Sequence, residues 1–297
     1  MAVVFAVSCP IKLNLTLRVL NKRSDGYHEI RSLFWRLRSP ESLEAFFGSE
    51  KDGLSVFGDD IPGENLVIRA IRHIRNMCGD DALPPVNLRL YKRIPMGSGL
   101  GAGSGNAAAM IGLFRRICGG AKDAAVNLVS VGADVAFLAG DHEVALARGR
   151  GEVLEGLNGR PKAVVALFFP HWKSDTRHAY DMLDEAREGS VECIISDSEA
   201  RDEAVSVLGL LKDGRRVGLL PNDFFCCVGH EREYGEIADL ADESGALAWG
   251  LCGSGSAYFV LFNPEDSAGL RSMLASLAAL GAVKDRFQWL RKILVLE

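Results

Sequence analysis

The stretch "KRIPMGSGLGAGSGNAAAM", Lys92–Met110, decides how this chain is to be interpreted. Residues 86–91 before it alternate apolar and polar and predict a strand that ends by Pro95, and the apolar spacing after it predicts a helix from about Ser104. Between them, four of the seven residues Gly97–Gly103 are glycine. A strand, glycines and a helix N-terminus are typical of phosphate binding, because bare backbone N–H groups can approach an anion closely.

Two better-known phosphate loops do not fit this stretch. A Walker A loop requires Gly-Lys before Ser or Thr, and Gly-Lys occurs nowhere in the chain. A Rossmann fingerprint can be fitted to Gly97, Gly99 and Ala102, but the strand before it alternates, whereas the first Rossmann strand is nearly all apolar. On this stretch alone, a structural glycine-rich loop without a ligand stays an alternative.

The bulk composition excludes several classes of protein. The chain has 297 residues and a net charge of −5, which predicts two domains and gives no basic field for nucleic acid. No segment approaches the roughly 20 apolar residues of a membrane span. The seven cysteines form no CxxC pair and are interpreted as buried thiols of a cytoplasmic protein.

The remaining pattern mixes strands and helices. Residues 11–19 alternate and predict a half-buried strand whose polar face carries Lys12 and Asn14, followed by a turn at Ser24–Gly26. Further strands are predicted at 143–157, 163–170 and 290–296, and helices at 66–78, 122–130, 176–186, 197–211, 231–244 and 266–280. The elements follow no steady βαβ order, which favours an α+β fold.

Three further features could carry chemistry. "LCGSGSAYF" contains Gly253 and Ser254 in a second glycine-serine turn, which is either structural or functional. Asp134 is the one carboxylate in "VSVGADVAFLAG" and is either a helix N-cap or a functional group that needs a cation. Lys12 by itself is better explained as part of a solvated strand face.

Together these stretches resemble the three signature motifs of the GHMP kinases. "PIKLNLTLRVLNKRSDGYHEIRSLF", "ENLVIRA", "IPMGSGLGAGSGNAAA", "GADVAF", "ARGRGE", "PNDF" and "CGSGSAYF" follow one another in the order of that family. The "DGYHE" sequence is most similar to the branch that phosphorylates a cytidine-diphosphate-linked methylerythritol.

The resemblance implies a fold, an activity and partners. It implies an N-terminal domain like ribosomal protein S5 domain 2 at 1–157 and a ferredoxin-like C-terminal domain at 158–297. It implies transfer of the γ-phosphoryl group of ATP, with Mg²⁺, to the 2-hydroxyl of the cytidine-linked substrate, by a monomer or homodimer. Two alternatives remain: a GHMP kinase acting on mevalonate, homoserine or a sugar, and an inactive nucleotide-binding regulator on the same fold.

The resemblance also implies roles for individual residues. Asp134 matches the catalytic carboxylate and Lys12 its cationic partner. The ATP-binding positions would be Asn65, Pro95, Gly97, Ser98, Gly99, Leu100, Gly101, Ala102, Gly103, Ser104 and Gly105. The substrate-binding positions would be Asn14, Tyr27, His28, Tyr180, Gly253 and Ser254, with His28 at the edge of the cytosine and the two tyrosines stacking on it.

The chain departs from the family pattern at three positions. Gly105 stands where a second serine is common, Ala102 where glycine is common, and Ala136 where proline is common. The first departure weakens the case for serine as a metal ligand, which leaves Ser104 as a candidate Mg²⁺ contact. Ala102 requires a negative φ at its position.

Overall fold

The computed structural model describes residues 4–59, 63–118, 128–188, 194–284 and 287–296. These residues divide into two compact units. The first unit comprises residues 1–12, 36–96 and 101–142, and the second comprises 13–35, 97–100 and 143–297. Each unit therefore combines segments that are distant in the sequence, and the predicted domain boundary at 157 and 158 stays a prediction.

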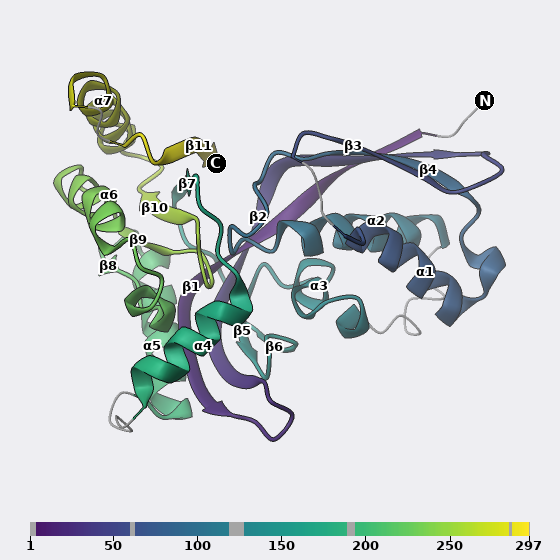
Figure 1. Ribbon diagram of the computed structural model, residues 1–297, viewed down its shortest axis with the longest axis horizontal. Helices are drawn as coiled ribbons and strands as arrows, with labels where there is room; N and C mark the ends of the chain where they lie inside the picture. Colours follow the sequence, from purple (N-terminus) through teal and green to yellow (C-terminus); the bar gives the residue numbers. More distant parts are fainter. Residues whose placement is uncertain (1–3, 60–62, 119–127, 189–193, 285–286, 297) are drawn as a thin grey trace. The chain divides into compact units, whose positions relative to one another are not determined.

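The first unit combines a small sheet with three helices. Strand β4 (Val86–Tyr91) pairs antiparallel with β2 (His28–Phe47) and parallel with β3 (Gly53–Phe57). The helices are α1 (Leu66–Cys78), α2 (Ala102–Cys118) and α3 (Ala133–Leu138), with short 3-10 turns at Asp80–Ala82 and Leu128–Ser130. Figure 1 shows α1 and α2 along one face of these strands, and the apolar side chains of both helices form a core with those of β4.

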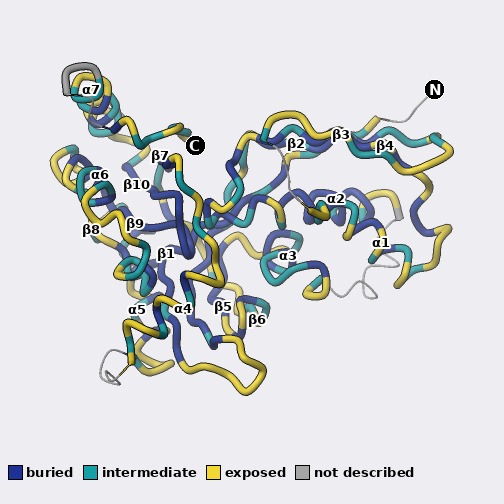
Figure 2. Tube along the Cα trace, viewed as in Figure 1, coloured by how far each residue is buried: buried dark blue, intermediate teal, exposed yellow. Residues whose placement is uncertain are grey.

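The second unit is built on a mostly antiparallel sheet. Its strand order is β11 (Leu290–Leu296), β7 (Val164–Pro170), β10 (Tyr258–Phe262), β9 (Ala248–Leu251) and β8 (Gly218–Leu219). The helices are α4 (Thr176–Arg187), α5 (Asp197–Lys212), α6 (Glu231–Glu243) and α7 (Ser267–Lys284), with a 3-10 turn η5 at Asp223–Cys226. Strands β5 (Val144–Arg148) and β6 (Val153–Gly156) pair with each other, and β5 pairs with the first half of β2. Figure 2 shows β7, β10 and β9 as buried strands.

The α+β prediction is confirmed, and most predicted elements are found with ends shifted by a few residues. The predicted strand at 143–157 is wrong as one strand, because residues 149–152 form a turn that returns the chain as the hairpin β5–β6. The helix predicted at 122–130 lies largely outside the described residues. Within the described ranges no helix is long and apolar enough to cross a membrane.

Strand β1 (Val4–Lys22) differs from its prediction in burial. A half-buried strand would expose its polar face, but Lys12, Asn14 and Thr16 are 7%, 4% and 1% exposed. The reason is that these side chains have polar partners: Asn14 donates to the hydroxyl of Ser32, and Thr16 accepts from the backbone N–H of Leu33. Polar side chains on this strand are thus interior groups.

Candidate functional site

The first unit brings Lys12 and Asp134 together. Helix α3 begins after Gly132, which has no side-chain capping bond, so the N-cap interpretation of Asp134 is wrong. Asp134 lies in the first turn, with its Oδ1 4.0 Å from the Nζ of Lys12. The Lys12 side chain is 8% exposed and that of Asp134 is 27% exposed. A partly exposed carboxylate beside a buried cation can accept a hydrogen bond from a ligand.

The absence of a side chain at Gly101 lets the backbone pass close to this pair. Its φ is +64°, and a Cβ there would lie 3.0 Å from Oδ2 of Asp134 and 3.3 Å from Cγ of Lys12. Helix α2 begins one residue later at Ala102, which has no positive φ, as the sequence analysis required. Ser104 is the third residue of the helix and therefore does not cap its N-terminus. The first N–H groups of α2 are the donors that a helix leaves unpaired.

One buried carboxylate holds the chain on both sides of the glycines. The side chains of Glu41 and Lys92 are 0% and 1% exposed, with Nζ 2.7 Å from the nearer carboxylate oxygen. Glu41 also accepts the backbone N–H groups of Arg93 and Ile94 at 3.0 and 2.8 Å, and the amide of Asn106 at 2.7 Å. The start of α2 and the segment before the glycines are therefore fixed to one side chain of β2.

Asn65 caps α1 and keeps one donor unused. Its Oδ1 accepts the N–H of Val67 at 2.9 Å. Its Nδ2 is buried and has no hydrogen-bond partner. A buried orphan donor costs about 1–3 kcal/mol unless it is satisfied, so this amide suits a ligand that brings an acceptor.

In the second unit, Gly97 and Gly99 lie against the second glycine-serine turn. Both have positive φ, of +72° and +78°, and a Cβ at Gly99 would lie 1.7 Å from the carbonyl oxygen of Cys252. The carbonyl of Gly97 accepts the N–H of Ser256 at 2.9 Å. The two glycine-rich stretches, more than 150 residues apart in sequence, are thus in backbone contact.

The same glycine-serine turn also contacts residues of β1 and α4. A Cβ at Gly253 would lie 3.3 Å from Oδ1 of Asn14, so the small residue lets these two segments approach. Ser254 shares a hydrogen bond of 3.1 Å with the hydroxyl of Thr176, the first residue of α4. Its carbonyl accepts from the hydroxyl of Ser174 at 2.7 Å.

His28 is held from two sides, whereas Tyr27 is exposed. The Tyr180 ring of α4 stacks on the imidazole with a centroid distance of 4.7 Å and an angle of 15°. Nε2 of His28 lies 2.7 Å from Oδ1 of Asp184, one turn further along α4. Tyr27 is 50% exposed and carries the guanidinium of Arg150 at 3.8 Å from its ring centre. Tyr180 therefore stacks on His28 itself.

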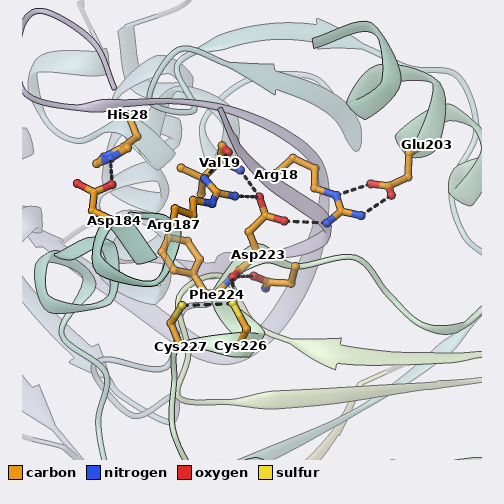
Figure 3. A network of polar contacts seen from close by, with 11 residues as sticks. Arg18, Val19, His28, Asp184, Arg187, Glu203, Asp223, Phe224, Cys226 and Cys227 are labelled. Carbon is orange, nitrogen blue, oxygen red and sulfur yellow. Dashed lines mark hydrogen bonds and ion pairs between the residues drawn. The ribbon is translucent and has the colours of Figure 1, made fainter. Parts of the chain in front are cut away.

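The "PNDF" motif ties these parts to β1. Figure 3 shows Asp223 between two arginines: its Oδ1 accepts from Arg18, and its Oδ2 accepts from Arg187 of α4 and from the N–H of Val19, at 2.7, 2.7 and 2.9 Å. The neighbouring Asn222 donates to the carbonyls of Leu251 and Gly253 at 3.1 and 2.8 Å. Two adjacent side chains thus hold α4 and the glycine-serine turn.

Comparison with known proteins places the chain in a family. The models "GHMP kinases N terminal domain" and "GHMP kinases C terminal" match residues 65–141 and 224–279. A 4-diphosphocytidyl-2-C-methyl-D-erythritol kinase of Chlorobaculum parvum is 32% identical, over 87% of this chain and 89% of its own. The chain belongs to the GHMP kinase family. A kinase of the same name from Porphyromonas gingivalis is 31% identical over 94% of this chain and 96% of its own.

The fold gives the same result. A crystal structure of 4-(cytidine 5'-diphospho)-2C-methyl-D-erythritol kinase matches this GHMP kinase with a TM-score of 0.74 and 28% identity, over 98% of both chains. The resemblance noted in the sequence and the expected GHMP kinase fold are thus confirmed.

Several residues that contact the candidate site were not singled out by the sequence analysis. Asn222 and Asp223 stood in a quoted motif without a role, and Glu41 and Lys92 gave no local signal. Asp184 follows Tyr180 by four residues on one helical face, which was a usable signal. Of the other expected ATP-binding positions, Pro95, Ser98 and Leu100 are buried and Gly103 is exposed. Among the described residues, no group of three or more His, Cys, Asp or Glu side chains could hold a metal ion.

Proposed function

We propose that this GHMP kinase transfers the γ-phosphoryl group of ATP to the 2-hydroxyl of 4-diphosphocytidyl-2-C-methyl-D-erythritol. The observation that carries the proposal is the Lys12–Asp134 pair, 4.0 Å apart, with the backbone of Gly101 close against it. Relatives with this activity in their names match nearly the whole chain.

Asp134 and Lys12 divide the chemistry between them. Asp134 accepts or orients the proton of the acceptor hydroxyl, since its carboxylate is partly exposed and can be reached. Lys12 lies beside that carboxylate and places positive charge where negative charge develops on the transferring group. Phosphoryl transfer has a loose transition state, so this positioning and neutralisation supply most of the catalysis.

The residues present fit a nucleotide. The first N–H groups of α2, which a helix leaves unpaired, suit phosphate oxygens. The unpaired amide of Asn65 suits an acceptor on the adenine. Bound ATP supplies the phosphoryl group and Mg²⁺ the neutralising charge. Mg²⁺ takes oxygen ligands, and Asp134 and Ser104 would hold it.

The acceptor side is assigned to the second unit. His28 would contact the edge of the cytosine. Tyr27 would stack on the face of the base, with the Arg150 guanidinium on the opposite face of the tyrosine ring or displaced from it. Asn14 and the turn at Gly253 and Ser254 would contact the remainder of the substrate. A monomer or homodimer located in the cytoplasm stays the expectation from the sequence.

Two alternatives are disfavoured by particular observations. A mevalonate, homoserine or sugar kinase has no use for a buried histidine anchored as His28 is. An inactive regulator has no need of the Lys12–Asp134 pair.

The experiment is ADP release with ATP and Mg²⁺, comparing the cytidine-linked substrate with mevalonate and homoserine. Turnover with the cytidine-linked substrate alone is expected, and turnover only with another acceptor would contradict the proposal. Asp134→Asn should lower kcat by about 10²–10⁴-fold while nucleotide binding persists. Asp141→Asn, an exposed carboxylate just beyond α3, is the matched control and should leave kcat unchanged.

A further inference from the structure

We propose that Asp184 and Lys22 are positioning residues that fix the tautomer of His28 and thereby select cytosine over uracil. The inference rests on the proposed function, because it takes His28 as the side chain that meets the base. It adds the two residues that decide what His28 can recognise.

The contacts form a chain of three side chains. Nε2 of His28 lies 2.7 Å from Oδ1 of Asp184, and Nζ of Lys22 lies 2.7 Å from Oδ2 of the same carboxylate. Figure 3 shows His28 and Asp184 pointing toward one another. His28 is 9% exposed, and the parallel ring of Tyr180 prevents it from turning about its own axis.

This geometry determines which nitrogen carries hydrogen. An ionised carboxylate only accepts hydrogen bonds, so Nε2 must be the donor. Burial alone raises the pKa of Asp184, but hydrogen bonds from Lys22 and His28 outweigh it and bring the pKa below its ordinary value. The carboxylate is therefore ionised at neutral pH. In a neutral imidazole with hydrogen on Nε2, Nδ1 is an acceptor.

An acceptor at Nδ1 discriminates between the two pyrimidines. Cytosine presents the N4 amino group as a donor, where uracil presents the O4 carbonyl as an acceptor. Nδ1 accepts a hydrogen bond from the first and faces a lone pair of the second. Sites that hydrogen-bond one partner reject the isostere that cannot pair, because a buried polar group is then left unsatisfied.

Lys22 preserves this preference. Its ammonium binds Oδ2 of Asp184 at 2.7 Å, which leaves Oδ1 of that carboxylate facing Nε2 of His28. The side chain is exposed, but the turn at Ser24–Gly26 begins just after it and holds this end of β1 in place.

The tautomer is measured directly by ¹⁵N NMR of histidine-labelled protein without substrate. The wild type should show a protonated Nε2 and an unprotonated Nδ1 for His28. Asp184→Asn should keep this pattern, because the amide oxygen still accepts, whereas Asp184→Ala should give a mixture of tautomers. Asp181→Asn, an exposed carboxylate on the same helix, is the control and should change nothing. Hydrogen on Nδ1 alone in the wild type would overturn the inference.

The selectivity is measured as kcat/KM for the cytidine-linked substrate relative to its uridine-linked analogue. Asp184→Ala and Lys22→Met should each reduce this ratio about 10-fold, the equivalent of one hydrogen bond, with KM for ATP unchanged. Asp184→Asn should keep most of the wild-type selectivity for the cytidine-linked substrate. A folded Asp184→Ala variant with the wild-type ratio would overturn the inference and leave the proposed function intact. A wild type that uses neither substrate would overturn both.

Discussion

We expect Gly105→Ala to destabilise the kinase although alanine is the better helix former. A Cβ on Gly105 would lie 1.7 Å from the carbonyl oxygen of Pro10 and 2.9 Å from its carbonyl carbon. Both are backbone atoms, so they cannot rotate away. The matched variant is Gly112→Ala in the same helix, where a Cβ meets nothing within 4 Å.

The two variants separate helix propensity from steric contact. Gly112→Ala should raise the free energy of unfolding by about 0.5–1 kcal/mol, because alanine has less conformational freedom to lose. Overpacking usually costs about 1–3 kcal/mol. Since the propensity gain is common to both, Gly105→Ala should be about 1–3 kcal/mol less stable than Gly112→Ala. Gly105→Ser, which restores the residue common in the family, should behave like the alanine variant.

Urea denaturation of the nucleotide-free chain measures these differences, and steady-state kinetics measure the consequence for activity. Pro10 lies two residues before Lys12, so a backbone shift at Pro10 should displace the Lys12 ammonium from Asp134 and lower kcat. Equal stability of Gly105→Ala and Gly112→Ala, within about 0.5 kcal/mol, would refute the reasoning.

Three further outcomes follow from buried or paired groups. Lys92→Met should cost about 3–5 kcal/mol in urea denaturation, because its carboxylate partner is left buried and unpaired. Burial raises the pKa of Cys9 to about 12, so iodoacetamide at about pH 8 should label the exposed Cys226 and spare Cys9, as mass spectrometry can show. The hydrogen bond from Arg75 lowers the pKa of Asp52; the stability from this pair is complete above the ordinary pKa and is lost as pH falls through the lowered pKa, so wild type and Asp52→Asn should converge only as the pH falls below about 4.

The periodic elements could be predicted because their signals are local. The spacing of apolar residues in α1 and the turn before Tyr27 each depend on a few neighbouring residues. The burial of the polar face of β1 could not be predicted, since alternation says which residues share a face but not what covers it. Lys12 is opposed by Asp134, more than a hundred residues later in the chain.

The residues of the candidate site likewise include some that the sequence predicts and others that it does not. The glycines at positions of positive φ could be predicted from the sequence, because few other residues adopt that backbone conformation. Glu41 could not be predicted, because it resembles any other surface carboxylate in the sequence. Its role depends on partners from distant segments, such as Lys92, which only the folded chain brings to it.

The attachment of Glu41 to both Ile94 and Asn106 has a thermodynamic consequence. The segment from Pro95 to Gly105 connects two residues that are fixed to one carboxylate. The entropy of bringing its two ends together is therefore lost when the chain folds. A nucleotide then binds to ends that are already in place, and less ordering accompanies its arrival. Loosening that anchor would shift the ordering into the binding step, where calorimetry would record it as a less favourable entropy of ATP binding.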